Sequence, residues 1–231
     1  MEITWLGHST FQLRTGNGEV LVLDPWIEGN PKYPAGHSFD RVDAILVSHG
    51  HFDHIGGAVT LARQFKAPVV SNFEICNWLE SKGVPATCAM NKGGSQKAGP
   101  ITVTMTHAFH SSGIQDDGKM IYGGEPAGFV LHLPDGRRAY FAGDTAVFSD
   151  MALIRELYQP ELAMLPIGDL FTMGPKEAAL ACRLLKPKKV IPMHFGTFPP
   201  LTGTPEELAS LIEDQPETEV WPLEPGKPVN W

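Results

Sequence analysis

The segment Ser48–His54, SHGHFDH, places four potential metal ligands directly after an apolar run. They are the histidines His49, His51 and His54 and the carboxylate Asp53. Imidazole suits zinc, iron, nickel or copper, and an added carboxylate extends the set to manganese. Polar rings crowded in this way would be costly to bury without a partner. The segment therefore predicts a metal-binding site.

Three further candidate ligands stand later in the chain, at His110, Asp144 and His194. Each follows a predicted strand, as His49 does, and loops at strand ends are where rigid scaffolds present chemistry. We expect these side chains to converge on one edge of a sheet. His107 competes with His110 for the role of ligand, but it lies nearer the strand and is expected to pack or cap.

The number of ligands indicates two ions. His49 and His51 can face one ion, while Asp53 and His54 continue past them and can reach a second. A single zinc is saturated by four protein ligands, so seven candidates predict two divalent ions that share one carboxylate. We expect zinc at both positions, with manganese, nickel and iron as alternatives.

Several other residues are candidates for supporting roles. Asp24 ends a strand before Pro25, and we predict that it orients the histidine loop, since ligating histidines need a partner on the other ring nitrogen. His8 either lines the substrate pocket or bonds backbone carbonyls as a structural histidine. Asp53, or His8 if it lines the pocket, is the candidate catalytic proton shuttle. Four residues form a candidate apolar pocket wall, although each could instead belong to the core: Trp26, Phe171, Met173 and Phe198.

The elements that must position these residues are β-hairpins followed by alternating strands and helices. Strands are predicted at 3–6, 10–14, 19–24, 42–47, 68–70, 101–106, 129–133, 138–142, 162–166 and 189–192. Helices are predicted at 56–65, 73–81, 150–158, 175–185 and after Thr204. Loops are predicted at 26–40, 91–99 and 111–127, the last as a lid or a surface loop. This order predicts sheet layers covered by helices.

Composition narrows the class of protein. The 231 residues, 42% of them hydrophobic, predict one globular domain over 1–231. A net charge of −8 argues against nucleic acid or anionic membrane as partners and leaves a small-molecule substrate. The three cysteines are widely spaced and are expected to be reduced, and no signal peptide or membrane span is seen, so we expect a cytoplasmic protein. A homo-oligomer is possible, since symmetric assemblies are common.

The motifs resemble those of a known family. SHGHFDH has the form HxHxDH, the hallmark of the metallo-β-lactamase superfamily, and His110, Asp144 and His194 follow in that superfamily's order. WLGHST, GDT, PIGDLFTMGP and MHFGT are similar to stretches of the UPF0173 metal-dependent hydrolases. That group is similar to ascorbate-6-phosphate lactonase and, more distantly, to N-acyl-phosphatidylethanolamine phospholipase D. The resemblance covers essentially the whole chain.

The resemblance implies a fold and a division of the ligands. The fold would be a four-layer αββα sandwich of the metallo-β-lactamase type. One ion would be held by His49, His51 and His110, and the other by Asp53, His54 and His194, with Asp144 bridging the two.

The expected activity is hydrolysis of a small ester, lactone or phosphodiester by a metal-bridging hydroxide. No Gly-x-Ser-x-Gly elbow supplies a protein nucleophile. One alternative is a mononuclear-iron sulfur or oxygen enzyme that resembles persulfide dioxygenases. Flavodiiron proteins carry glutamate where this chain has His51, which counts against a flavodiiron function. Nucleases of the superfamily carry extra domains or basic arms, whereas this chain has a net charge of −8, which counts against a nuclease. The remaining alternative is a non-catalytic metal-dependent binding protein.

Overall fold

The alternating N-terminal segments build the first of two sheets in the computed structural model, which describes residues 1–231. Three antiparallel strands are followed by three parallel ones: β1 (Glu2–Trp5), β2 (Phe11–Arg14), β3 (Val20–Leu23), β4 (Ala44–Leu46), β5 (Val69–Asn72) and β6 (Thr87–Met90). The C-terminal β16 (Pro228–Asn230) pairs with β1, so the sheet order is β16-β1-β2-β3-β4-β5-β6.

The second sheet has the order β15-β14-β13-β12-β11-β8-β7. Its strands are β7 (Ser95–Ala98), β8 (Ile101–His107), β11 (Ala127–His132), β12 (Arg138–Phe141), β13 (Leu162–Pro166), β14 (Lys189–Met193) and β15 (Glu219–Val220). The half from β7 to β12 is antiparallel, and the half from β12 to β15 is parallel. The carboxyl ends of β12, β13 and β14 therefore reach the same edge.

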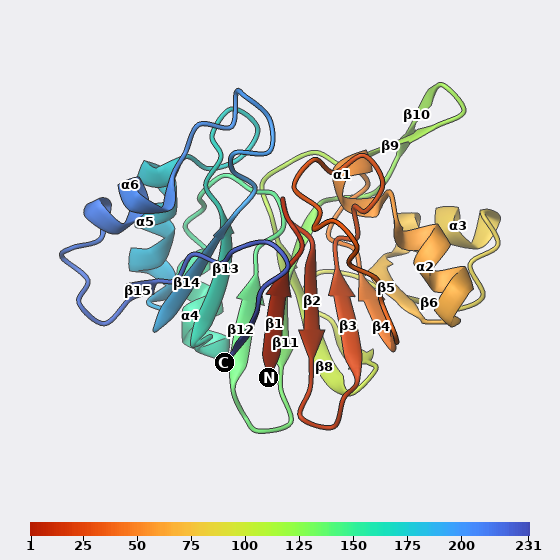
Figure 1. Ribbon diagram of the computed structural model, residues 1–231, viewed down its shortest axis with the longest axis horizontal. Coiled ribbons are helices and arrows are strands. Elements are labelled where there is room, and N and C mark those ends of the chain that lie inside the picture. Colours follow the sequence, from red (N-terminus) through yellow and green to blue (C-terminus); the bar gives the residue numbers. More distant parts are fainter.

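The two sheets pack face to face, and helices cover their outer faces (Figure 1). The first sheet carries α1 (Phe52–Ile55), α2 (Ala58–Phe65) and α3 (Phe73–Ser81), and the second carries α4 (Met151–Tyr158), α5 (Pro175–Leu185) and α6 (Pro205–Leu211). Fully buried Phe11 and Phe141 meet between the sheets. The four-layer αββα architecture is confirmed. No helix has both the length and the apolar character needed to cross a bilayer.

Helix starts follow from capping residues. Thr204 caps α6 by accepting a hydrogen bond from the Glu207 amide, and Pro205 occupies the first turn, so the helix starts after Thr204 as predicted. Asn72 caps α3 in the same way, through the Ile75 amide. The helix predicted over 56–65 is shorter, because Gly57 separates α2 from the short α1.

Two segments predicted as loops contain strands. The glycine-rich stretch 91–99 includes β7, which is defined by its pairing with β8 rather than by its own polar sequence. Residues 111–127 contain a hairpin of β9 (Gly113–Asp116) and β10 (Lys119–Tyr122), which projects from the body of the protein (Figure 1). Asp117 and Gly118 both have positive φ, which is the backbone that an Asp-Gly hairpin turn needs. The expectation of an irregular loop was wrong at both places.

Candidate metal centre

The seven predicted ligands meet at one edge of the two sheets. His49, His51, Asp53 and His54 follow β4, the last two within α1. The other three follow strands of the second sheet: His110 after β8, Asp144 after β12 and His194 after β14. Residues separated by more than a hundred positions in sequence are thus brought close together.

Three histidine nitrogens form one group. His51 Nδ1 lies 3.0 Å from His49 Nε2 and 3.3 Å from His110 Nε2. Burial lowers the pKa of all three imidazoles, so they are neutral at pH 7. Neutral imidazole is the form that binds a metal.

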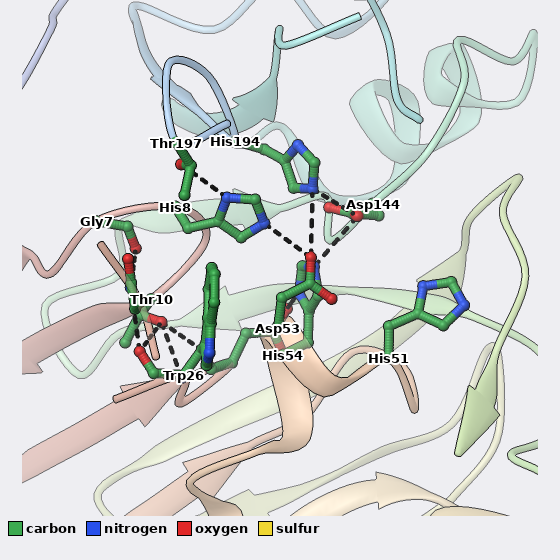
Figure 2. Close-up of polar contacts among 12 residues, drawn as sticks. Gly7, His8, Thr10, Trp26, His51, Asp53, His54, Asp144, His194 and Thr197 are labelled. Carbon is green, nitrogen blue, oxygen red and sulfur yellow. Dashed lines mark hydrogen bonds and ion pairs between the residues drawn. The ribbon is translucent and has the colours of Figure 1, made fainter. Parts of the chain in front are cut away.

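A carboxylate and two histidines form a second group (Figure 2). Asp53 Oδ2 lies 4.0 Å from both His54 Nε2 and His194 Nε2. Burial has the largest single effect on the pKa of Asp53 and raises it. The neighbouring His54 and the hydrogen bond from His8 together outweigh burial and lower the pKa to about 2. Asp53 is therefore an ionised carboxylate at neutral pH.

Asp144 stands between the two groups. Its Oδ2 atom is 3.0 Å from His194 Nε2 and 3.2 Å from His54 Nε2, and it is 3.7 Å from His110 Nε2 and 4.0 Å from His49 Nε2. One oxygen thus faces two nitrogens of each group, which is the position of a bridging ligand.

The polar atoms of this cluster fit a cation. Asp144 Oδ1 is buried without a hydrogen-bond partner, and His54 Nε2 faces Asp144 Oδ2 without the alignment of a hydrogen bond. A buried polar atom left unpaired costs about 1–3 kcal/mol. Burial alone lowers the pKa of His54, but the surrounding Asp144, Asp53 and Asp24 outweigh it and raise that pKa well above its usual value. A positive charge is therefore favoured at the position where a metal ion would bind.

Asp24 lies directly behind the ligands. Its carboxylate accepts hydrogen bonds from His54 Nδ1 at 2.7 Å, from the Ser48 amide at 2.7 Å and from Ser48 Oγ at 2.6 Å. Ser48 Oγ in turn lies 2.9 Å from His49 Nδ1. These contacts occupy the Nδ1 atoms of both histidines and direct their Nε2 atoms into the cluster. The position is the one that the prediction for Asp24 requires.

His8 is held behind Asp53 rather than at an open surface (Figure 2). Burial lowers the pKa of His8 to about 4, so the ring is neutral at pH 7. Its Nε2 donates to Asp53 Oδ2 at 3.0 Å, and its Nδ1 accepts from Thr197 Oγ1 at 2.9 Å. The side chain is completely buried, so His8 does not line an open pocket, and its ring bonds side chains rather than backbone carbonyls. The structure thus corrects both interpretations of His8.

The four residues predicted as an apolar wall do not form one surface. Trp26 is buried beside His8, with ring centroids 5.1 Å apart, and it contacts Phe198 at 5.8 Å. Met173 is completely buried in the core under α5, whereas Phe171 is 62% exposed. Met173 therefore cannot touch a substrate.

Sequence reasoning missed Phe52 and Thr197, although each stands beside a predicted residue. Phe52 lies between two candidate ligands and packs edge-on against Trp26 at 5.8 Å. Its place inside SHGHFDH was the signal that could have found it. His107 lies outside the cluster, as predicted. Its Nδ1 atom is 3.1 Å from Lys92 Nζ. The three cysteines are free.

Comparison with known proteins places this chain in a family. A family model described as "Beta-lactamase superfamily domain" matches residues 20–195. A UPF0173 metal-dependent hydrolase of Solibacter usitatus is 70% identical over 231 residues, which cover 100% of both chains. This chain belongs to the UPF0173 family. A second UPF0173 metal-dependent hydrolase, from Koribacter versatilis, is 50% identical over 98% of this chain and 97% of its own.

A solved structure of a similar protein agrees with the fold. Igni18, described as a novel metallo hydrolase from the archaeon Ignicoccus hospitalis, shares 35% identity with this chain. The two superpose with a TM-score of 0.86 over 99% of this chain and 97% of Igni18. Both the resemblance to UPF0173 and the metallo-β-lactamase fold are confirmed, and the chain is a metal-dependent hydrolase of that superfamily.

Proposed function

We propose that this hydrolase uses two divalent metal ions to cleave a small uncharged ester or lactone. The observation that carries the proposal is the position of Asp144 Oδ2, within 4.0 Å of Nε2 atoms from both ligand groups. His49, His51 and His110 would hold one ion, Asp53, His54 and His194 the other, and Asp144 both. Zinc is the first expectation, and manganese, nickel and iron are the alternatives.

Two bound ions would supply hydroxide at neutral pH, by lowering the pKa of water from 15.7 toward about 7, and would polarise the bond to be cleaved. The protein's own contribution is position and proton transfer. Asp53 is partly exposed and ionised, so it is the residue placed to accept a proton. His8 fixes the carboxylate of Asp53 through its Nε2 hydrogen bond and acts as a positioning residue.

Charge favours an uncharged substrate over a phosphodiester. No lysine or arginine hydrogen-bonds or ion-pairs with any of the seven ligands. A cleft beside His110 is lined by Glu125 and by no basic residue. Because an anionic phosphodiester or a nucleic acid would find no lysine or arginine in the lining of this cleft to pair with its charge, carbonyl chemistry is the better match. We place the enzyme in the cytoplasm with a small-molecule substrate.

The same geometry argues against the two alternative functions. A mononuclear-iron sulfur or oxygen enzyme would need one ligand group, whereas two groups converge on Asp144. A non-catalytic metal-binding protein would need no access to the ions, whereas the side chains of Asp53 and His110 are 14% and 13% exposed.

The test is turnover of 4-nitrophenyl acetate, a chromogenic lactone and bis(4-nitrophenyl) phosphate, before and after chelation and zinc add-back. We expect ester or lactone turnover that chelation abolishes and zinc restores. His110→Ala should lower kcat/KM at least a hundredfold, while the matched control His107→Ala leaves it unchanged. Turnover of the phosphodiester alone, or turnover that survives chelation, would contradict the proposal.

A further inference from the structure

Seven of the eleven exposed large apolar side chains lie on ligand-bearing segments, on the loop after β13 or on β10. Phe52, Phe109, Leu170 and Phe171 are each more than half exposed and belong to the loops of Asp53, His110 and the β13 end. Three more are on β10, where Met120 is 71% exposed, Ile121 38% and Tyr122 68%. Exposed apolar side chains that gather at one face mark a binding surface.

The β9–β10 hairpin is held in place by its first strand. Ile114 of β9 is buried against Gly50, between two candidate ligands. Asp116 accepts a hydrogen bond from Trp78 Nε1 at 2.9 Å and pairs with Lys82 Nζ at 2.6 Å, both from the α3 region. The arm that projects in Figure 1 is therefore fixed by contacts of β9, while every residue of β10 is exposed.

A cleft connects β10 to the metal centre. Its lining includes His110 and Ser111, and also Met120, Ile121 and Tyr122 of β10. Gly113 also lines the cleft, and a Cβ atom at this position would collide with the Met120 side chain. The cleft meets the metal centre at His110, whose side chain is 13% exposed, whereas His49 and His54 are completely buried.

We propose that this cleft binds an apolar chain of the substrate, so that the enzyme acts on esters or lactones carrying a medium-length alkyl or acyl group. The assignment rests on the proposed function, since the head of the substrate must lie at the metal ions. Because the cleft is lined by His110 itself, its occupant should be part of the substrate rather than a separate partner. Met120 and Tyr122 are two positions apart on β10, so their side chains point to the same side of the strand, where they supply contact area.

The inference is tested by the binding of a hydroxamate series to the zinc-loaded full chain. Acetohydroxamate, butyrohydroxamate, hexanohydroxamate and octanohydroxamate share a metal-binding head and differ only in chain length. Each buried methylene should tighten binding about fourfold. If the cleft buries about three of the six methylenes by which octanohydroxamate exceeds acetohydroxamate, octanohydroxamate should bind about sixtyfold more tightly. Calorimetric titration reads this ratio without requiring turnover.

The double variant Met120→Ser/Tyr122→Ser should reduce the ratio of octanohydroxamate to acetohydroxamate affinity at least tenfold. Both residues are exposed, so the fold should be retained, which an unchanged melting temperature checks. Leu157→Ser, at a residue 67% exposed on α4, is the matched control and should leave the ratio unchanged.

Two results would overturn the inference. One is a hydroxamate series with equal affinities, even if 4-nitrophenyl acetate is hydrolysed, in which case the proposed function survives alone. The other is a double variant that changes a dimer to a monomer in light scattering without changing the affinity ratio, which would make β10 a contact between copies. A length-dependent affinity without turnover of any ester would support the cleft and refute the proposed reaction instead.

Discussion

Replacement of Asp24 by asparagine should weaken the binding of the second metal ion, the one proposed to be held by Asp53, His54 and His194. The backbone should not be disturbed. Asp24 has a φ of 42°, a conformation that aspartate and asparagine tolerate and that strains most other residues. Asp24→Asn therefore keeps the chain path, whereas Asp24→Ala would add strain to the loss of hydrogen bonds. The conservative variant isolates the carboxylate.

The magnitude follows from the contact with His54. The amide of asparagine is uncharged, and its nitrogen cannot accept the hydrogen bond that Asp24 accepts from His54 Nδ1 at 2.7 Å. Hydrogen bonds to charged groups are worth about 1.5–3 kcal/mol, or roughly 10- to 150-fold in an equilibrium constant. Removal of such an outer partner typically costs about 10- to 100-fold in metal affinity. We expect the second zinc to bind about 10- to 100-fold more weakly.

The assay is a competitive titration of zinc against a chromogenic chelator, followed by kcat at saturating zinc. Asp43→Asn is the matched control, because Asp43 accepts a hydrogen bond from the Val20 amide at the opposite end of β4. Asp43→Asn should bind two zinc ions like the wild type. If Asp24→Asn also binds both ions with wild-type affinity, the account of Asp24 as the orienting residue is wrong.

Three further predictions concern other groups. His8→Asn keeps the positive-φ backbone, but its amide cannot reach Asp53 as the imidazole does. The affinity for the second ion should therefore fall about tenfold in the same titration. An unaltered affinity would contradict the positioning role of His8. The pKa of His54 is raised by the carboxylates of Asp144, Asp53 and Asp24, so the metal-free site holds a proton that metal displaces. Zinc affinity should therefore fall as pH drops, and calorimetry in buffers of different ionisation enthalpy should detect proton release. Burial raises the pKa of Cys76 to about 12, so its thiol should react with a disulfide reagent at pH 8 far more slowly than half-buried Cys88, as mass spectrometry of the labelled protein would show.

Much of the fold could be predicted because the information is local. The paired runs around Asn17-Gly18 and the capping of α6 by Thr204 depend only on neighbouring residues. The spacing within SHGHFDH likewise indicates a metal site without any knowledge of the fold. β7 could not be recognised, because a polar segment becomes a strand there through pairing with β8. The β9–β10 hairpin did carry a local signal, the Asp-Gly turn, which was overlooked.

The surroundings of the ligands were harder to predict. His8 and Thr197 are 189 positions apart, and their hydrogen bond depends on how the two sheets pack. The burial of Met173 and the exposure of Phe171 likewise depend on the path of the loop between β13 and α5. Residue type alone does not decide between a core position and a pocket wall.

The most direct test of the central claim is the metal content of the purified protein and of two variants. Elemental analysis should find about two ions per chain in the wild type and about one each in His110→Ala and His194→Ala, because each variant loses a ligand from a different group. A wild type that holds a single iron, or variants that each lose all metal together, would contradict a centre built from two groups joined by Asp144.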